Sequence, residues 1–588
     1  MLTTLAAPAF AKEWYIEDGD ITVKAGETGN DVTQNNETTY GDTGTIITNH
    51  DKDTPSSNTV TIEAEDKGDK VEVTLKDVNI DASRGSEAAV SVTGKGDTTI
   101  ELDGDNELKS GAGHAGLEHN KTDTSGELTI QDKDNNGSLE AAGGFKGAGI
   151  GSAGSNDAQV KITGGNITAT SDDWGAGIGS GSYGTGTVEI TGGEINATGG
   201  YLGAGIGGGC NGSGNVTISG GTITAAGSDG AAGIGGGYYN GATVTITGDA
   251  VIKNASSTKY GAGIGGGNGS DGNVTISGNA KIENATGGYG AAGIGGGAFS
   301  SPDKIGNGNV VIKDNAKIDN VQGGAYGAGI GGGIYGLSNV TIEGNTKVNA
   351  TGGAGGAAIG GGAGAENNSD NNGNQITIKS NENGSPTINA VGGGTDEGKK
   401  IVIGGAGIGA GCESDADADI TLEGKVTITA TAGKDNVAIG ANGIEQEFSG
   451  LAEGSSITRY GSEGNDITLP TDPVPAVPSS SGGGSADASV QESVFPGLVV
   501  TDKDGQRISY TSIRDNNVLS LRVGRFTASL RASLATLRQL RAEGIDTITF
   551  QTILCSTTLS VDELLAMGGE DAEAVLTHRL TASSLTVG

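Results

Sequence analysis

The octapeptide LGAGIGGG at residues 202–209 contains a G-x-G-x-x-G pattern, formed by Gly203, Gly205 and Gly208. In dinucleotide-binding proteins this pattern follows a buried strand and opens a helix, with an acidic residue about 20 positions further on. The residues that follow here, CNGSGNVTISGGTITAAG, are rich in glycine and β-branched residues and poor in helix formers. The sequence therefore argues against a nucleotide-binding loop.

The octapeptide is one of a series of related motifs of the general form G-A-G-I-G. Ten copies occur, and most follow one another at intervals of 28 to 36 residues. A motif that recurs at a nearly constant interval is typical of a structural repeat. The isoleucines that mark the ten copies are Ile150, Ile178, Ile206, Ile234, Ile264, Ile294, Ile330, Ile359, Ile408 and Ile439.

Each repeat contains three short segments with the composition of β-strands. The first has a V-x-I alternation, as at Val188 and Ile190, which places two apolar side chains on one face. The second carries one branched residue, such as Ile195, and the third is the glycine-rich segment with the marker isoleucine. Turn sequences such as TGG and SGG separate the three segments.

Three strands in 28–30 residues form one coil of a solenoid, because a single coil must stack on its neighbours to bury its apolar face. Stacked coils pair in parallel about 4.8 Å apart, and parallel crossovers favour right-handed winding. The sequence therefore predicts an all-β, right-handed, single-stranded parallel β-helix. In the second strand, polar residues such as Asn284 and Asn320 are predicted to bond from coil to coil.

The composition limits both the core and the partners of the protein. The 588 residues include 113 glycines and only 34% hydrophobic residues, so a broad globular core is not expected. The regular spacing of valine and isoleucine argues against a disordered chain. A formal net charge of −36 makes nucleic acid and anionic membrane surfaces poor partners. No apolar stretch reaches the length of a transmembrane segment.

Five segments are expected along the chain. Residues 1–11 are interpreted as the remnant of a signal peptide, because Ala9-Phe10-Ala11 forms an A-x-A cleavage site behind an apolar stretch. We therefore expect a secreted protein, extracellular or at the cell surface; an ordinary frayed terminus is the alternative. The other segments are irregular coils with a cap at 12–140, regular repeats at 141–445, an end cap and a Pro/Ser/Gly-rich linker at 446–496, and a small α/β module at 497–588.

The C-terminal module is expected to contain helices as well as strands. The segment RFTASLRASLATLRQLRAEG (525–544) has apolar residues at helical spacing and predicts a helix that ends at Gly544. The strand-like segment IDTITFQTIL follows it, and Ser560 begins a capping-box pattern before a second, short helix.

The chain resembles secreted bacterial carbohydrate-binding parallel β-helix proteins. The resemblance rests on VEVTLKDVNIDASRGSEAAVSVTG (71–94) and on the repeated GAGIGGG…VTISGGTITA, and it extends over residues 12–445. It implies the binding of a polysaccharide, often together with calcium. No binding residue of that family can be matched individually to this sequence, and the C-terminal module lies outside the resemblance.

The aromatic residues of the repeats point to a glycan-binding function. They lie four or five residues from a marker isoleucine, so coil stacking is expected to align them in two rows beside a smooth Gly/Ala floor. Sugar rings stack on such side chains, and an extended row suits a polymer. The alternative is that the rings stiffen the turns of a structural or protein-binding surface repeat. The candidates are Trp174, Tyr183, Tyr201, Tyr238, Tyr239, Tyr260, Tyr289, Tyr326 and Tyr335.

One segment suggests a calcium site. Asp132, Asp134 and Asn136, followed by Gly137, match the front half of a calcium-binding loop. The bidentate glutamate expected at the twelfth position is replaced by Gly143. A polar turn between two strands explains the same residues, and both interpretations stay open.

A polysaccharide lyase or glycoside hydrolase is the rival function, because such enzymes share this fold. No arginine lies between Arg84 and Arg459, and the only histidines there are His114 and His119, so the regular coils lack a lyase base or clamp. Acidic pairs such as Asp172-Asp173, or the series Asp415/Asp417/Asp419, could serve a hydrolase, but acidic loop residues are usually only solvated. We assign no catalytic residue and expect a polysaccharide or glycoconjugate partner on a cell wall or host surface.

The three cysteines form neither a metal-ligand cluster nor a disulfide framework. Cys210 and Cys412 occupy the same position in two repeats, but six coils separate them. At about 4.8 Å per coil the two thiols should lie roughly 29 Å apart, beyond the reach of a disulfide. We predict that they are not paired with each other.

Overall fold

The structure is a computed structural model that describes residues 12–298, 304–366, 373–396, 398 and 401–473, and most of residues 498–587. In the last range the exceptions are 503–504, 506, 509, 516, 524–526, 553–554, 568–571 and 580–581. The predicted signal remnant at 1–11 and most of the linker lie outside the described residues. The chain forms two compact units, Met1–Ala476 and Val477–Gly588, which are treated separately below.

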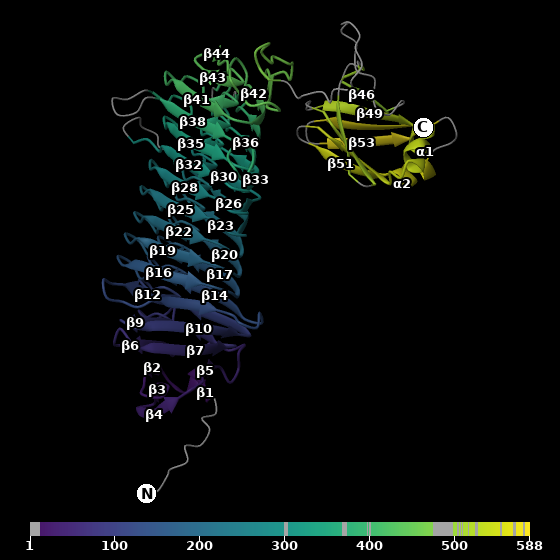
Figure 1. The fold of residues 1–588 in the computed structure, drawn as a ribbon. Coiled ribbons are helices and arrows are strands. Elements are labelled where there is room, and N and C mark those ends of the chain that lie inside the picture. Colours follow the sequence, from purple (N-terminus) through teal and green to yellow (C-terminus); the bar gives the residue numbers. More distant parts are fainter. Residues whose placement is uncertain are drawn as a thin grey trace. The chain divides into compact units, whose positions relative to one another are not determined.

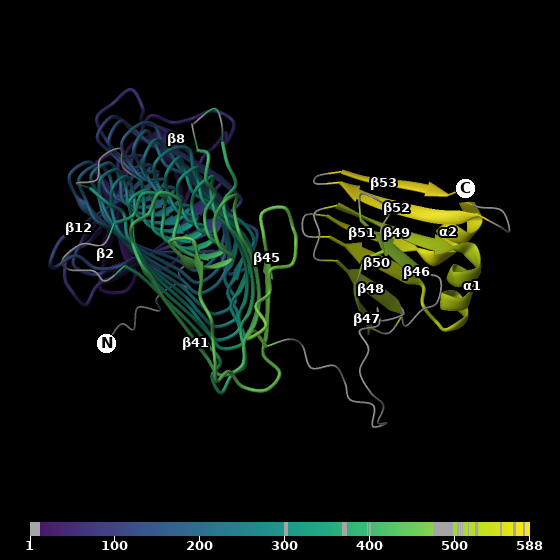
Figure 2. The same ribbon diagram turned by 90° about the horizontal axis from the view of Figure 1, so that it is seen from above.

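The first unit is a parallel β-solenoid of about 16 turns with about 30 residues per turn. Successive coils lie directly above one another (Figures 1 and 2). Three ladders of parallel strands run along the stack, as the repeat pattern predicts, and each strand pairs with its counterpart in the next coil. Val188 pairs with Val216, and Ile178 pairs with Ile206.

The first ladder contains the V-x-I strands. Its members are β5 (Thr45–Thr48), β7 (Lys70–Lys76), β10 (Asp97–Asp103), β13 (Leu128–Gln131), β16 (Asp157–Ile162), β19 (Gly186–Ile190), β22 (Gly214–Ile218), β25 (Ala242–Ile246), β28 (Gly272–Ile276), β32 (Gly308–Ile312), β35 (Ser338–Glu343), β38 (Asn374–Lys379) and β41 (Ala418–Glu423). The short strand β1 (Glu13–Tyr15), followed by the 3-10 helix η1 (Ile16–Asp18), pairs with β5.

The second ladder contains the strands with a single branched residue. Its members are β8 (Asn79–Asp81), β11 (Asp105–Lys109), β14 (Ser138–Gly143), β17 (Asn166–Ser171), β20 (Glu194–Thr198), β23 (Thr222–Gly227), β26 (Val251–Ser257), β29 (Lys281–Ile282), β30 (Ala285–Thr286), β33 (Lys317–Gln322), β36 (Lys347–Thr351), β39 (Thr387–Val391), β42 (Thr427–Thr431) and β45 (Ser456–Tyr460).

The third ladder passes through the marker isoleucines. Its members are β2 (Ile21–Ala25), β6 (Val60–Ala64), β9 (Val90–Gly94), β12 (Leu117–Lys121), β15 (Ile150–Gly151), β18 (Ile178–Gly179), β21 (Ile206–Gly207), β24 (Ile234–Gly235), β27 (Ile264–Gly265), β31 (Ile294–Gly295), β34 (Ile330–Gly331), β37 (Ile359–Gly360), β40 (Ile408–Gly409) and β43 (Ile439–Ala441).

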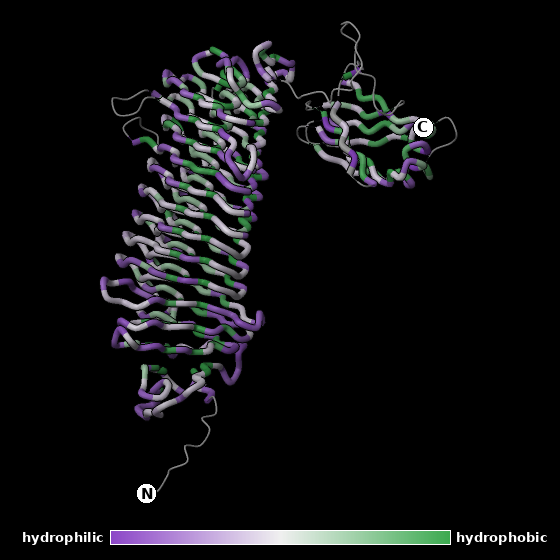
Figure 3. Tube along the Cα trace, viewed as in Figure 1, coloured by the Kyte–Doolittle hydropathy of each residue, from purple (hydrophilic) through white to green (hydrophobic). Residues whose placement is uncertain are grey.

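The core of the solenoid is a stack of identical aliphatic side chains. Every marker isoleucine is fully buried, as are the isoleucines of the V-x-I strands such as Ile190 and Ile218. Hydrophobic segments recur at the same place in successive coils (Figure 3). Each buried isoleucine contributes roughly 1.5–3 kcal/mol, so the thin core gains its stability from repetition.

The predicted polar column bonds between coils in part. The Asn320 side-chain amide donates to Asn284 Oδ1 at 3.1 Å, and the Asn284 amide donates to the Lys253 carbonyl at 3.0 Å. A second column, in the turns before the second ladder, runs from Asn345 to Asn315 at 3.2 Å and from Asn315 to Asn279 at 3.3 Å. These amides satisfy exposed turns and hold the register of the coils.

Both ends of the solenoid are covered. At the N-terminal end, β3 (Asn30–Gln34) and β4 (Glu37–Asp42) extend β2 as an antiparallel sheet. At the other end β43 pairs with β44 (Ile444–Glu445), and Arg459 of β45 stands in register with Ala430 of the core. The Arg459 guanidinium is fully buried and binds both oxygens of Asp472 at 2.7 and 2.8 Å and Glu445 at 2.6 Å.

The C-terminal unit contains two four-stranded sheets and two helices around one apolar core. One sheet contains β46 (Leu498–Thr501), β49 (Thr527–Ser533), β52 (Glu573–Arg579) and β53 (Ala582–Val587). The other contains β47 (Thr511–Asp515), β48 (Val518–Arg522), β50 (Thr547–Gln551) and β51 (Ser556–Ser560). The helices are α1 (Leu534–Ala542) and α2 (Val561–Met567).

The predicted helix at 525–544 is wrong in its first half. β49 occupies Thr527–Ser533, where Ala528, Leu530 and Ala532 alternate as buried residues with period two, and α1 begins only at Leu534. The Ser533 side chain accepts a hydrogen bond from the Thr536 N–H and starts the helix there. The predicted cap of the second helix is confirmed, because Ser560 Oγ accepts from the Glu563 N–H at 3.4 Å.

Two further expectations concern membranes and disulfides. Within the described residues, no helix is long and apolar enough to span a membrane. Neither Cys210 nor Cys412 forms a disulfide, so the prediction that they are not paired with each other is confirmed.

Candidate glycan-binding ridge

The glycine-rich segment of each coil is a tight corner between two β-turns. Around Ile206, the Ala204 N–H donates to the Gly208 carbonyl at 3.0 Å, so the chain doubles back across a strand of two residues. The Gly203 N–H bonds to the Gly200 carbonyl at 2.9 Å and closes the turn before the strand. The Gly212 N–H bonds to the Gly209 carbonyl at 2.7 Å and closes the turn after it.

This geometry corrects the expected Gly/Ala floor. Residues 203–210 are all buried, so no smooth surface lies between the aromatic rows. Neighbouring corners approach too closely for a side chain: a Cβ on Gly207, at φ +129°, would lie 2.1 Å from the Gly235 carbonyl oxygen. The glycines therefore serve the contact between coils and offer no surface to a ligand.

The two turns of adjacent coils are joined by hydrogen bonds. The Tyr238 N–H donates to the Leu202 carbonyl at 3.1 Å, and the Ala298 N–H donates to the Tyr260 carbonyl at 2.7 Å. The turn that follows the marker isoleucine of one coil is thus bonded to the turn that precedes the marker isoleucine of the previous coil. The predicted pair of rows is one ridge, composed of the described residues four and five positions before and after the marker isoleucines. We call this surface the aromatic ridge.

The structure places all nine predicted aromatic residues on the aromatic ridge, but in separate groups. Tyr238 and Tyr239 have ring centroids 3.9 Å apart. Tyr289 lies edge-on between Tyr260, at 6.1 Å, and Tyr326, at 5.6 Å. Tyr183, Tyr201, Tyr239 and Tyr289 are exposed, whereas Trp174, Tyr238, Tyr260, Tyr326 and Tyr335 are half-buried. Phe145, also exposed, lies 5.2 Å from Trp174.

Five of these tyrosines have a left-handed backbone conformation. Tyr260 and Tyr326, in the turns before the strand, have φ of 54° and 74°, and Tyr183, Tyr239 and Tyr335, in the turns after it, have φ of 67°, 63° and 63°. This conformation costs an L-residue with a Cβ roughly 1–2 kcal/mol. Some other coils place glycine at the same positions: Gly230, Gly290 and Gly355 before the strand, and Gly269 and Gly364 after it. Others place a non-aromatic side chain there in the same conformation, such as Leu202 at φ 68° and Ser155 at φ 68°.

Lysine side chains accompany two of the aromatic groups. Lys146 Nζ lies 5.4 Å from the Phe145 ring and 5.3 Å from the Trp174 ring, and Lys304 Nζ lies 4.3 Å from the Tyr239 ring. These are cation–π distances. Burial and the hydrogen bond to the Tyr239 hydroxyl raise the pKa of Tyr238 to about 12, so its phenol stays neutral and can act as a hydrogen-bond donor.

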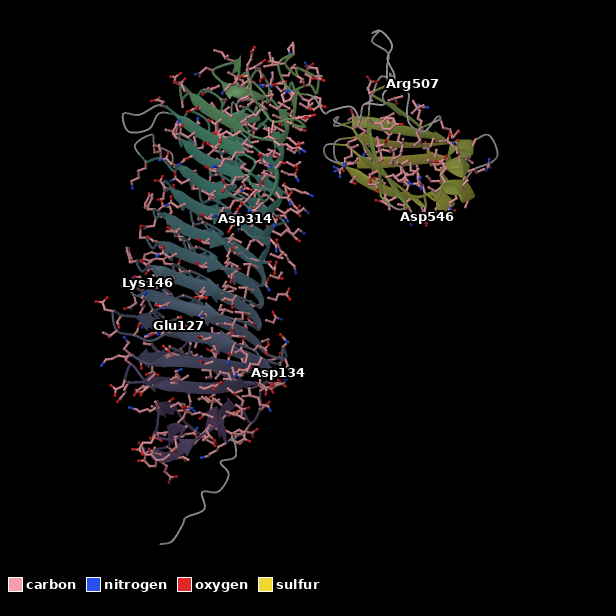
Figure 4. The ribbon with its side chains drawn as sticks, viewed as in Figure 1. Glu127, Asp134, Lys146, Asp314, Arg507 and Asp546 are labelled. Carbon is pink, nitrogen blue, oxygen red and sulfur yellow. The ribbon has the colours of Figure 1, made fainter. Side chains whose placement is uncertain are left out.

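The predicted calcium residues lie away from the aromatic ridge. Figure 4 shows Asp134 at the opposite edge of the coils from Lys146. The two Asp132 carboxylate oxygens accept the Asn136 and Gly137 N–H groups at 3.2 and 3.0 Å, and the Asn136 amide donates to Asp134 at 3.1 Å. The polar-turn interpretation accounts for these contacts.

Stacking adds a residue that sequence reasoning missed. Carboxylate oxygens of Glu101, Asp132 and Asp134 lie within 4.8 Å of one another. Glu101 is supplied by the preceding coil, where β10 pairs with β13, so only the register of the coils reveals it. Lys133 Nζ lies 3.5 Å from Glu101 and 3.0 Å from Glu72, and would compete with a cation. Calcium binding stays a prediction.

Most of the acidic residues considered for a hydrolase lie on the surface. Asp172, Asp415, Asp417 and Asp419 are exposed. In the part of the chain that the structure describes, Glu101, Asp132 and Asp134 are the one group of three acidic, cysteine or histidine side chains gathered closely enough for a metal.

Comparison with known proteins supports the architecture. Four segments match the family model described as a Beta helix repeat. They span residues 160–182, 188–210, 216–238 and 274–298. Each segment begins in a V-x-I strand and ends four residues after a marker isoleucine, so the matches share the register of the coils. No curated protein and no solved structure matches the chain significantly.

Proposed function

We propose that this is an extracellular carbohydrate-binding, adhesive protein whose aromatic ridge binds a polysaccharide. The observation that carries the proposal is the left-handed backbone at Tyr183, Tyr239, Tyr260, Tyr326 and Tyr335. Glycine would relieve that strain at each position and is used for this purpose in neighbouring coils. Strained residues that persist where an easier residue fits are typical of functional sites.

The chemistry of the aromatic ridge suits a sugar polymer. Aromatic faces stack on the apolar faces of sugar rings, while tyrosine hydroxyls donate and accept hydrogen bonds. The ridge is rigid, because main-chain bonds such as Cys210 N–H to Trp174 carbonyl, 2.7 Å, join its turns. The coils repeat it along the solenoid, which offers several equivalent contacts to a long chain. We place the partner, a polysaccharide or glycoconjugate, on a cell wall or host surface.

A second function, as a structural or protein-binding surface repeat, is favoured by a different observation. Some rings pack on glycines of the ridge: a Cβ on Gly364 would lie 2.8 Å from the Tyr335 ring, and one on Gly230 would lie 2.5 Å from the Tyr238 ring. Such rings fill space between turns, as expected if they stiffen the solenoid.

The two functions predict different effects for one double variant. In the full-length chain, Tyr239→Asn and Tyr335→Asn place asparagine where Asn211 already has φ 57° in an equivalent turn. Asparagine tolerates this conformation better than tyrosine. If the ridge binds glycans, the double variant should bind at least tenfold more weakly, since one lost stacking contact is worth about 1 kcal/mol, and its melting temperature should be unchanged or higher.

Binding is measured by electrophoretic retardation in gels that contain soluble xylan, galactomannan, mixed-linkage β-glucan or polygalacturonate. The matched control is Tyr40→Asn, which changes an exposed tyrosine of β4 outside the ridge and should leave both measurements unchanged. Undiminished retardation together with a lower melting temperature would favour the structural role. The absence of retardation in all four gels would refute the proposal for these polysaccharides.

A further inference from the structure

One lysine of the aromatic ridge is not neutralised by the protein itself. Lys146 lies four residues before Ile150. Its ammonium lies 5.4 Å from the Phe145 ring and 5.3 Å from the Trp174 ring, and among the described residues it forms neither an ion pair nor a hydrogen bond. The two rings attract the cation, but they leave its three hydrogen-bond donors unused.

Most other half-buried lysines of the solenoid are paired with a carboxylate. Lys161 Nζ lies 3.4 Å from Glu189, and Lys281 Nζ lies 2.7 Å from Glu283. Acidic residues are abundant, at 71 against 35 basic residues. An unpaired ammonium between aromatic rings is therefore a point at which this negatively charged protein presents a positive charge.

The rings and the ammonium are accessible from outside the chain. Phe145 is 41% exposed, and Lys146 and Trp174 are half-buried. Lys146 Nζ is not among the buried side-chain atoms that lack a partner, so an ammonium that makes no hydrogen bond of its own is open to solvent. The Ser182 N–H donates to the Lys146 carbonyl at 2.9 Å and thereby places Tyr183, which is 58% exposed, on the adjoining turn.

The nearby carboxylates limit the charge that a ligand can carry here. Asp172 and Asp173 directly precede Trp174. Asp173 acts electrostatically on the Cys210 thiol and forms no ion pair with Lys146. Together with the net charge of −36, these carboxylates repel a polymer that is charged at every sugar. A neutral polymer with isolated carboxylates avoids most of this repulsion.

We propose that Lys146, together with the Phe145 and Trp174 rings, forms a subsite for a sugar that carries a carboxylate, such as a uronate borne at intervals on an otherwise neutral polysaccharide. The inference rests on the proposed glycan binding and specifies its chemistry. The sugar ring stacks on the exposed Phe145 ring, and its carboxylate accepts charge-assisted hydrogen bonds from the ammonium. Tyr183 offers a further aromatic face to the neighbouring sugar of the polymer.

The test uses the full-length chain and pairs of polymers that differ only in their carboxylates. One pair is xylan with glucuronic acid branches and the same polymer after reduction of its carboxyl groups. The others are galactomannan and mixed-linkage β-glucan, each before and after oxidation of a small fraction of its primary hydroxyl groups to carboxylates. Isothermal titration calorimetry measures binding. For the backbone that wild type binds, the member with carboxylates should bind about fivefold more tightly, as expected for an ion pair open to solvent. The preference should decrease at about 1 M NaCl, where the Debye length is about 3 Å.

The decisive variant is Lys146→Leu, because Leu202 occupies the equivalent position of another coil at φ 68°. It should bind both members of the pair equally, at the level of the neutral polymer, with little change in melting temperature. Lys146→Arg retains the charge and should retain the preference. Lys313→Leu is the matched control: Lys313, in the turn after β32, is also half-buried and without an ion pair among the described residues. This control changes the net charge equally and should bind as wild type does.

The outcomes separate failure of the inference from failure of the proposed function. Equal binding of both members by wild type, a preference that Lys146→Leu retains, or the same loss in Lys313→Leu refutes the subsite. So does tighter wild-type binding to polygalacturonate, which is charged at every sugar. In each of these cases the glycan function stands if the Tyr239→Asn, Tyr335→Asn variant loses binding. If circular dichroism shows that Lys146→Leu alters the fold, Lys146→Asn removes the charge with a residue suited to this backbone conformation and decides in its place. The absence of wild-type binding to any polymer refutes both.

Discussion

At the scale of single residues, the solenoid tolerates a few polar atoms that its own packing does not satisfy. Thr98 is 1% exposed and its hydroxyl has no hydrogen-bond partner among the described residues. The ladder places it between Val71 and Leu128, two buried aliphatic residues at the same position of adjacent coils. The site therefore has the shape and the surroundings of a valine.

We expect Thr98→Val to stabilise the protein by about 1 kcal/mol, because valine has nearly the same shape and removes an unsatisfied buried hydroxyl. Urea unfolding monitored by far-ultraviolet circular dichroism measures the change in the free energy of unfolding. Thr217→Val, at an exposed position of the same kind of strand, is the matched control and should change it little. A destabilised Thr98→Val protein would show that the hydroxyl has a partner.

At the scale of elements, the last coil replaces a core alanine by a buried cation. In the strand β45, Arg459 follows Ala430 in the ladder, and Asp472, which is also buried, binds it with both oxygens. Burial alone would lower the pKa of Arg459, but the hydrogen bonds with Asp472 and Glu445 raise it on balance, so the charge is retained. The ion pairs lie at this end of the stack, beyond which the described residues add no further coil.

Removing this arginine should be strongly destabilising. Arg459→Met leaves two carboxylates without their cation, and breaking a buried pair typically costs about 3–5 kcal/mol. The change is measured as the shift of the solenoid transition in urea unfolding of the full-length chain. Arg84→Met, at the exposed arginine of an N-terminal coil, is the control. A loss below about 1 kcal/mol for Arg459→Met would show that the end of the stack is held by its apolar contacts alone.

At the scale of the whole molecule, the chain has two compact units with separate cores, and each contains a buried histidine. In the C-terminal unit the His578 nitrogens lie 3.2 Å from Thr552 Oγ1 and 2.9 Å from Thr557 Oγ1. In the solenoid, His119 Nδ1 lies 3.0 Å from the Gln159 carbonyl. Burial lowers the pKa of both imidazoles below the ordinary value of 6.5, because the charged form loses its hydration.

The lowered pKa values predict that acid destabilises both units. Between pH 6.5 and the folded pKa the unfolded state binds the proton and the folded state does not, so stability is complete above pH 6.5 and decreases as pH falls, by at most about 1.4 kcal/mol per pH unit and histidine. His578→Gln should flatten this dependence for the C-terminal transition and His119→Gln for the solenoid transition, as scanning calorimetry from pH 7.5 to 5 would show. An unchanged slope in either variant would contradict the assignment to that histidine.

The periodicity of the sequence by itself determined the architecture of the solenoid. The V-x-I alternation, the single branched residue of the second strand and the marker isoleucines predict three strands per coil, and the ladders pair them in that register. Repetition strengthens such a prediction, because the same pattern of residues occurs in successive coils. The prediction failed in the C-terminal unit, where a strand period of two and a helical period overlap. Leu530 and Leu534 fit a helical spacing, yet Leu530 lies in β49 and Leu534 begins α1.

Only the tertiary structure decided the form of the candidate site. The sequence located the aromatic residues beside the marker isoleucines, but it could not show that Tyr239 adopts φ 63° or that the glycines between the rows are buried. Nor could it show that Glu101 lies beside Asp132, or that Asn268 Oδ1 has no hydrogen-bond partner among the described residues. The physical reason is that periodicity specifies which residues share a face, whereas turn conformation and contacts between coils depend on how closely the stacked backbones approach.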